Sequence, residues 1–192
     1  MKRNSLWYLY IFICFSHILL LVSTVLKDDF VISDMTNRFS RIVLFTVIFL
    51  IFFFIFLKKE LFKKKNYVLI LLLLSFTVYI DSVGNYFNLY KGTNFDDWVH
   101  FLNPLVISIC IFIYFFRIKS LKRNISILLG SSISLSLIAI WEIYEYWSDI
   151  LLDTHLVIGL EDTSTDLTYG LFGVVVSLIF ILLFKSSGSR SK

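Results

Sequence analysis

Residues 66–90 read NYVLILLLLSFTVYIDSVGNYFNLY, and this stretch contains both features that determine the fold class. The stretch is largely apolar, and its 25 residues exceed the roughly 20 that a helix needs to cross a bilayer core. Its second part carries Asp81, Asn85 and Asn88, which recur at helical spacing and therefore share one face. A carboxylate at membrane depth costs about 2.5–3.5 kcal/mol on insertion scales, so Asp81 indicates a partner or a function.

Five further apolar runs accompany this stretch, and together they predict an integral membrane protein. Of the 192 residues, 58% are hydrophobic and only 17% are charged, whereas about a quarter of the residues in a soluble domain are charged. The six predicted spans are Trp7–Leu26, Arg41–Leu57, Asn66–Tyr90, Trp98–Phe116, Asn124–Trp147 and Leu167–Phe184. We therefore expect an all-α bundle of six transmembrane helices in one domain, residues 1–185, followed by a short basic, Ser-rich cytoplasmic tail at 186–192.

The basic residues predict the orientation of these helices. Lys and Arg cluster before the first span, between the second and third, between the fourth and fifth, and after the last. In a six-span topology these positions share one side, and the positive-inside rule makes that side, with both termini, cytoplasmic. All acidic residues except Glu60 belong to the opposite side. The net charge of +4 thus reflects juxtamembrane clusters near lipid head groups, and it does not predict nucleic-acid binding.

Acidic and imidazole side chains recur at helical spacing near the extracytoplasmic ends of the last four predicted spans. Asp97 and His100, for example, are three residues apart, and such pairs lie on one helix face. Turning these faces toward one another keeps the carboxylates out of lipid. The sequence therefore predicts one site whose catalytic or metal-ligating residues are Asp97, His100, Glu142 and Asp166. Four further residues are predicted to surround them: Asp81, Asn85, Glu145 and Asp162.

Three chemistries fit such a site, and the residues alone leave them open. Mixed carboxylate and imidazole ligands on facing helices suit divalent metals such as Zn, Mn or Fe. Neighbouring carboxylates can also share protons and serve acid–base catalysis or a proton relay. Polar groups at the outer leaflet can instead recognise a lipid head group or an isoprenoid-linked sugar. A purely structural network is the remaining alternative, although hydrogen bonds between membrane helices contribute only about 0.6–2 kcal/mol each.

Other polar and aromatic residues of the outer connections have simpler interpretations. Four acids are predicted to be solvated loop residues: Asp96, Asp149, Asp153 and Glu161. Trp98, Trp141 and Trp147 are predicted to anchor the helices at the membrane interface. No nucleotide-binding loop, GxSxG, HExxH or cysteine-based zinc motif occurs in the chain.

Three strings carry a resemblance to known families: Asp97-Trp98-Val99-His100-Phe101, Glu142-Ile143-Tyr144-Glu145, and Asp162-Thr163-Ser164-Thr165-Asp166 followed by Gly170 and Gly173. They resemble the YjdF-like family of bacterial inner-membrane proteins and, more loosely, the VanZ-like family, over about residues 79–176. The chain has Gly170 where VanZ-like proteins usually carry Asn. The resemblance implies a multi-pass protein of the bacterial cytoplasmic membrane. It implies little about the reaction, because YjdF-like proteins are essentially uncharacterised and VanZ-like proteins are linked to glycopeptide tolerance.

These observations favour a small membrane protein that binds or acts on a lipid-associated or envelope substrate, with a divalent metal as candidate cofactor. Membrane lipids are its expected partners. Two alternatives stay open at this level: a cation- or proton-coupled transporter that uses the same acids, and a non-enzymatic envelope or antibiotic-tolerance accessory protein. Whether the protein is an enzyme, and how many copies assemble, does not follow from the sequence.

Overall fold

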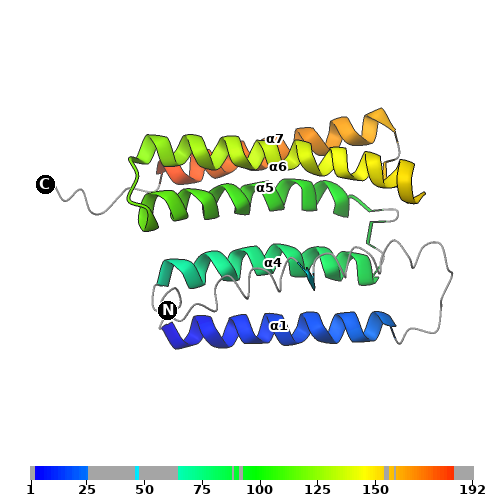
Figure 1. Ribbon diagram of the computed structural model, residues 1–192, viewed down its shortest axis with the longest axis horizontal. Coiled ribbons are helices and arrows are strands. Elements are labelled where there is room, and N and C mark those ends of the chain that lie inside the picture. The colour runs from blue at the N-terminus through cyan, green and yellow to red at the C-terminus, as the bar shows by residue number, and fades with distance from the viewer. Residues whose placement is uncertain are drawn as a thin grey trace, which may run out of the picture.

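The computed structural model describes residues 3–25, 46–47, 65–87, 89–90, 93–153, 156–157 and 159–183. Its helices are α1 (Arg3–Val25), α4 (Lys65–Phe87), α5 (Phe95–Ile113), α6 (Arg123–Leu152) and α7 (Leu160–Leu183), and a π-helical turn, η1 (Tyr114–Ile118), extends α5 (Figure 1). No strand occurs among the described residues. The predicted all-α class is therefore confirmed for this part of the chain.

Four helices are long and apolar enough to cross a membrane: α4, α5 extended by η1, α6 and α7. In α1 the described residues give only a shorter apolar stretch, Ile11–Leu20, which is below the length needed to count as a candidate span. The second predicted span, Arg41–Leu57, lies outside the described residues except for 46–47. The structure thus supports four candidate spans, while the count of six and the cytoplasmic placement of the termini stay predictions.

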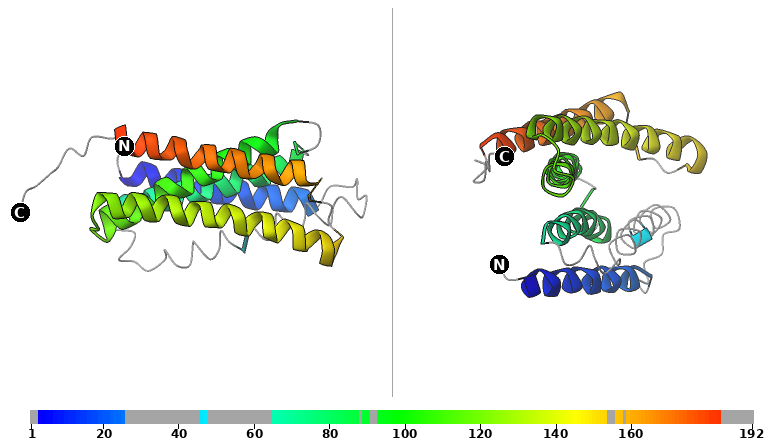
Figure 2. Two further views of the ribbon diagram at one scale, coloured as in Figure 1. Left: turned by 90° about the horizontal axis from the view of Figure 1, so that it is seen from above. Right: turned by 60° about the vertical axis from the view of Figure 1, so that its left-hand side comes forward.

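The described helices pack side by side, and α5 lies at the centre of their contacts (Figures 1 and 2). It contacts α4 on one side and both α6 and α7 on the other, and its largest contact is with α7. Helix α1 packs against α4, away from the other three. A residue on the inward face of α5 can therefore meet side chains from α6 and α7 at once.

Small residues allow α6 and α7 to approach α5 closely. A Cβ atom built on Gly173 of α7 would lie 2.2 Å from the backbone carbonyl oxygen of Phe101. Hydroxyls reinforce the same contacts: Ser177 donates to Ser108 Oγ at 2.8 Å, and Ser134 donates to the carbonyl oxygen of Pro104 at 2.9 Å. Close backbone approach with hydroxyl hydrogen bonds is typical of packing between membrane helices.

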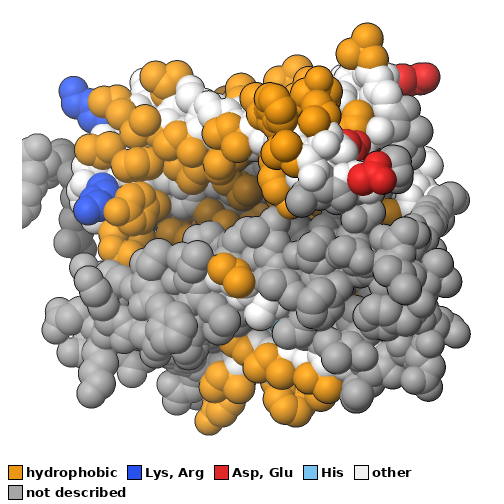
Figure 3. Space-filling view, turned by 45° about the vertical axis from the view of Figure 1, so that its right-hand side comes forward, with side chains coloured by type: hydrophobic (Ala, Val, Ile, Leu, Met, Phe, Trp, Pro, Cys, Tyr) orange, Lys and Arg blue, Asp and Glu red, His pale blue; other side chains and the backbone are white. Residues whose placement is uncertain are grey.

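Charged side chains separate along the bundle. On the face seen in Figure 3, Lys and Arg lie at one end and Asp and Glu at the other. The basic end contains Lys65 at the start of α4 and Arg123 at the start of α6. We call the opposite end, where α5 and α7 begin, the acidic end of the bundle.

Candidate functional site

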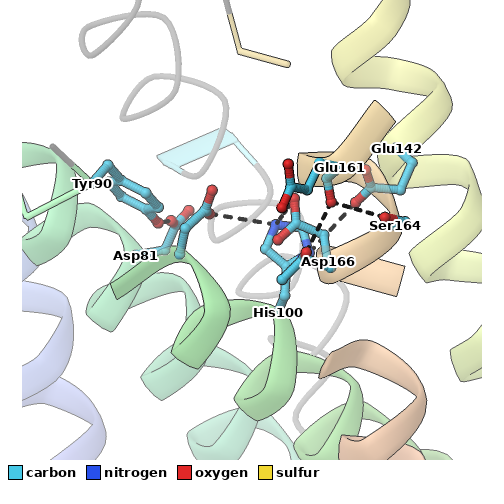
Figure 4. Close-up of polar contacts among 9 residues, drawn as sticks. Asp81, Tyr90, His100, Glu142, Glu161, Ser164 and Asp166 are labelled. Carbon is cyan, nitrogen blue, oxygen red and sulfur yellow. Dashed lines mark hydrogen bonds and ion pairs between the residues drawn. The ribbon is translucent and has the colours of Figure 1, made fainter. Parts of the chain in front are cut away.

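His100 is the centre of the polar cluster at the acidic end. It lies near the start of α5 and is buried, with 7% of its surface exposed. Its Nδ1 atom is 3.5 Å from Glu142 Oε1 of α6, and its Nε2 atom is 3.4 Å from Asp96 Oδ1 and 3.9 Å from Asp166 Oδ2 of α7. Figure 4 shows His100, Glu142 and Asp166 pointing toward one another. Three helices therefore deliver side chains to one imidazole.

Four buried residues could hold a single metal ion. His100, Glu142, Glu145 and Asp166 each offer one ligand atom, and these atoms all lie within 4.8 Å of one another. Ligand atoms bound at about 2.0–2.6 Å to one ion are separated by no more than about 5 Å. We call these four residues the buried donor group, and its spacing matches one coordination sphere.

A second set of acids adjoins the first. Asp96, Asp162 and Asp166 also offer ligand atoms within 4.8 Å of one another, and we call them the acidic triad. Asp166 belongs to both sets, whereas Asp96 and Asp162 are partly exposed. The cluster therefore extends from the buried donor group toward the surface at the acidic end.

Two glycines of α7 explain how Asp166 reaches this cluster. Gly170 and Gly173 follow Asp166 by four and seven residues, so all three share one helix face. A Cβ atom on Gly170 would lie 2.8 Å from the Ile138 side chain of α6, and one on Gly173 would meet the backbone of Phe101. Because these two glycines have no side chains, α7 packs closely against both α5 and α6, and Asp166 therefore lies between those two helices.

Glu142 shows the clearest sign of a ligand from outside the chain. Only 6% of its surface is exposed, and its Oε1 atom has no hydrogen-bond partner among the described residues. The 3.5 Å separation from His100 Nδ1 exceeds the normal hydrogen-bond range of about 2.7–3.2 Å. Buried polar atoms are nearly always satisfied, so this oxygen requires an explanation such as an ion, a water or a proton.

The structure brings together three of the four residues predicted as ligands: His100, Glu142 and Asp166. Glu145, predicted as part of the surroundings, lies in the buried donor group itself. Asp162 lies in the acidic triad, next to the group it was predicted to surround. The predicted cluster was to draw on four helices. The geometry brings together its members on α5, α6 and α7 but not Asp81 and Asn85 of α4, and it does not test the roles of the members.

Asp97 does not join either donor set, and its neighbour Asp96 takes the place beside His100. The solvated-loop interpretation of Asp96 was therefore incorrect. In an α-helix a four-residue step leaves two side chains about 40° out of line, whereas a three-residue step leaves about 60°. Side chains also lean toward the helix N-terminus, which favours the i−4 neighbour. The four-residue spacing of Asp96 and His100 was the sequence signal that could have identified this residue.

Asp81 and Asn85 form a separate polar contact on α4. The Tyr90 hydroxyl donates a hydrogen bond to Asp81, and Asn85 Nδ2 donates to the Asp81 carbonyl oxygen at 3.0 Å. Figure 4 shows Asp81 and Tyr90 together, apart from Glu142 and Asp166. Both α4 residues are buried, but neither belongs to the buried donor group or the acidic triad.

Asp149 was also predicted as a solvated loop acid, and this interpretation was wrong. Its two carboxylate oxygens accept backbone N–H groups from Leu156 at 2.6 Å and Val157 at 2.8 Å. The carboxylate therefore fastens the connection between α6 and α7, which are the helices that carry Glu142 and Asp166.

We expect Asp149→Ala to loosen this connection, because two backbone N–H groups lose a charged acceptor worth about 1.5–3 kcal/mol per hydrogen bond. Limited proteolysis of the detergent-solubilised protein should show faster cleavage between α6 and α7. Glu161→Ala, which removes an exposed acid nearby, is the control and should leave the cleavage rate unchanged. Equal rates for Asp149→Ala and the wild type would contradict this role.

Comparison with known protein families places the chain in a described family. The family described as "Predicted membrane protein (DUF2238)" matches residues 6–187. No curated protein and no solved structure matches the chain. DUF2238 is the YjdF family, so the YjdF-like resemblance is confirmed, whereas the looser VanZ-like resemblance has no support. The match extends the resemblance over the first helix, and it carries no description of a reaction.

Proposed function

Because the chain belongs to the DUF2238 family of predicted membrane proteins, we propose that it is a multi-pass membrane protein with a divalent metal site in its buried donor group. The metal takes part either in binding a lipid-associated or envelope substrate or in a reaction on that substrate. The observation that carries the proposal is Glu142 Oε1, a buried carboxylate oxygen that faces His100 without a hydrogen-bond partner among the described residues. A cation between the two side chains satisfies both.

The composition of the buried donor group fits a metal ion. Three carboxylates at this spacing repel one another by about 4 kcal/mol per pair at an effective dielectric constant near 20. A divalent cation converts that repulsion into attraction, and one imidazole with three carboxylates suits Mn, Fe or Zn. Such an ion supplies Lewis-acid activation of a water or of a substrate oxygen.

The aromatic residues around the site support a lipid-associated substrate. Trp98 near the start of α5 and Trp147 near the end of α6 are 67% and 51% exposed. Exposed Trp side chains are enriched at the depth of the lipid head groups. The cluster of His100 and its acids lies at the same end of the same helices, where a head group or a lipid-linked envelope molecule can reach it. The charge pattern supports an orientation in which this end faces the extracytoplasmic side of a bacterial cytoplasmic membrane.

Metal content of the purified protein tests the proposal. We expect the full chain, stripped of metal in detergent and reloaded with Mn, Fe or Zn, to retain at least one ion per chain by elemental analysis. The control variant Glu161→Gln removes an exposed acid from the same end and should retain the same amount. A wild-type protein that retains none of the three metals would overturn the proposal and favour a proton relay or a structural network.

Cysteine labelling tests the proposed orientation. We expect Glu161→Cys to react with a membrane-impermeant thiol reagent in intact cells, and Lys122→Cys to react only after the membrane is opened. Both residues are exposed and lie at opposite ends of the bundle. The unmodified chain, whose Cys14 and Cys110 are partly and fully buried, sets the background. The reverse pattern would place the acidic end in the cytoplasm.

A further inference from the structure

We infer that the connection between η1 and α6 binds the phosphate of an anionic phospholipid head group. This connection carries three exposed cations, Arg117, Lys119 and Lys122, which we call the basic turn. The basic turn lies at the end of the bundle opposite the buried donor group, so it is independent of the proposed metal site. The three side chains act on one phosphate together, which separates this site from the general attraction between basic loops and a membrane surface.

The backbone folds the basic turn into a short, closed reversal of the chain. The N–H group of Lys119 donates to the carbonyl oxygen of Tyr114 at 3.0 Å, and that of Leu121 donates to the carbonyl oxygen of Phe115 at 2.9 Å. Ser120 has a φ of 57°, in the left-handed region, and the chain passes there from η1 into α6. The three cations therefore project from one compact turn.

The cations of the basic turn contact aromatic rings in place of acids. The guanidinium carbon of Arg117 lies 5.0 Å from the centre of the Phe116 ring, and Lys119 Nζ lies 5.6 Å from the centre of the Tyr114 ring. Neither of them, nor Lys122, forms an ion pair with a described residue. Like charges close together repel one another, and an anion placed among them converts that repulsion into attraction.

Exposed apolar side chains beside the basic turn favour a lipid over a soluble anion. Leu121 in the turn, and Ile125 and Leu128 in the first part of α6, are 37%, 45% and 65% exposed. Because α6 is a candidate membrane span, these side chains meet acyl chains at the same end where the cations meet the head groups. A phospholipid fits both parts, since its phosphate reaches the cations and its acyl chains cover the apolar side chains.

Native mass spectrometry of the full-length protein in a neutral detergent tests this site. Titration with phosphatidylglycerol should show a first bound lipid that is held more tightly than phosphatidylcholine. Lys119→Gln and Lys122→Gln should each weaken the binding of that lipid about fivefold, which corresponds to about 1 kcal/mol for each basic residue near a membrane surface. Lys65→Gln removes an exposed cation at the same end, outside the basic turn, and should leave the affinity unchanged.

Two outcomes of the titration would overturn the site or its occupant. Equal affinities for phosphatidylglycerol in the wild type, Lys119→Gln and Lys122→Gln would overturn the basic turn as the binding site. Inorganic phosphate should not displace the bound lipid any more than chloride does at the same ionic strength. Specific displacement by inorganic phosphate would overturn the choice of a lipid as occupant.

Photo-cross-linking of the wild type locates the lipid and does not depend on a variant that folds. A phosphatidylglycerol analogue with a photoreactive head group, added to phosphatidylcholine vesicles that contain the protein, should label the segment 117–125. A phosphatidylcholine analogue with the same reactive group should label this segment much less. Equal labelling by the two analogues, or labelling by the anionic analogue only at other segments, would overturn the inference and leave the proposed metal site untouched.

Discussion

Gly173→Val is expected to separate α7 from α5 and to dismantle the site. Even one Cβ atom at this position would lie 2.2 Å from the carbonyl oxygen of Phe101 and 3.1 Å from its carbonyl carbon. These are backbone atoms of a neighbouring helix, so no side chain can rotate away to make room. Overpacking a core usually costs about 1–3 kcal/mol, and we expect this backbone clash to exceed that range.

Thermal unfolding of the purified protein in detergent measures this effect. Gly173→Val should unfold at a clearly lower temperature than the wild type and should lose metal binding, because Asp166 moves with α7. Leu171→Val places the same β-branched residue at an exposed position of the same helix and should change neither property substantially. A Gly173→Val protein with wild-type stability and metal content would contradict the close packing of α5 and α7.

Glu142→Gln is expected to abolish metal binding while the protein still folds. The amide keeps the volume of the side chain and its capacity to form hydrogen bonds, and it removes the negative charge. Loss of groups that merely support metal ligands weakens metal affinity by about 10–100-fold, so loss of a ligand should cost at least about 100-fold. His100→Gln should behave similarly, because the Gln amide binds a divalent metal much more weakly than the imidazole that it replaces.

The alternative to a metal site predicts a different outcome for Glu142→Gln. If Glu142 only joined helices, the amide should serve nearly as well, since such hydrogen bonds contribute about 1 kcal/mol or less. Metal content and thermal unfolding measured on the same samples separate the two cases. Asp97→Asn adds a comparison, because Asp97 lies outside both donor sets and its variant should keep the metal. Normal metal content in both Glu142→Gln and His100→Gln would leave the structural network as the better account.

The class of the protein and the approximate place of its site follow from the sequence alone. Both depend on the free energy of moving apolar and charged side chains from water into the bilayer core. Apolar runs of membrane-spanning length are incompatible with a soluble domain of this size. Acids such as Glu142 and Asp166 are costly in lipid, so they must turn inward, and their positions along the helices place them all at one end. Helical spacing then selects the faces on which His100 and Glu145 lie.

Only the tertiary structure decides which of these acids meet. Asp96 and Asp97 are adjacent in sequence, and the rotation of α5 against α6 and α7 determines which of them lies beside His100. Asp149 shares a helix face with Glu142 and Glu145, yet it binds the backbone of the following connection.

The physical reason is that helical spacing reports which residues share a face, whereas contact between faces depends on how closely the backbones approach. In this protein that approach is controlled by glycines whose neighbours lie far away in the sequence. Gly173 packs against Phe101, and Gly170 packs against Ile138. Hydrophobic burial does not select one partner among several apolar helices in a membrane, so shape and close packing make the selection. The sequence determined that a polar site exists at one end, and the packing of α7 on α5 and α6 decided its members.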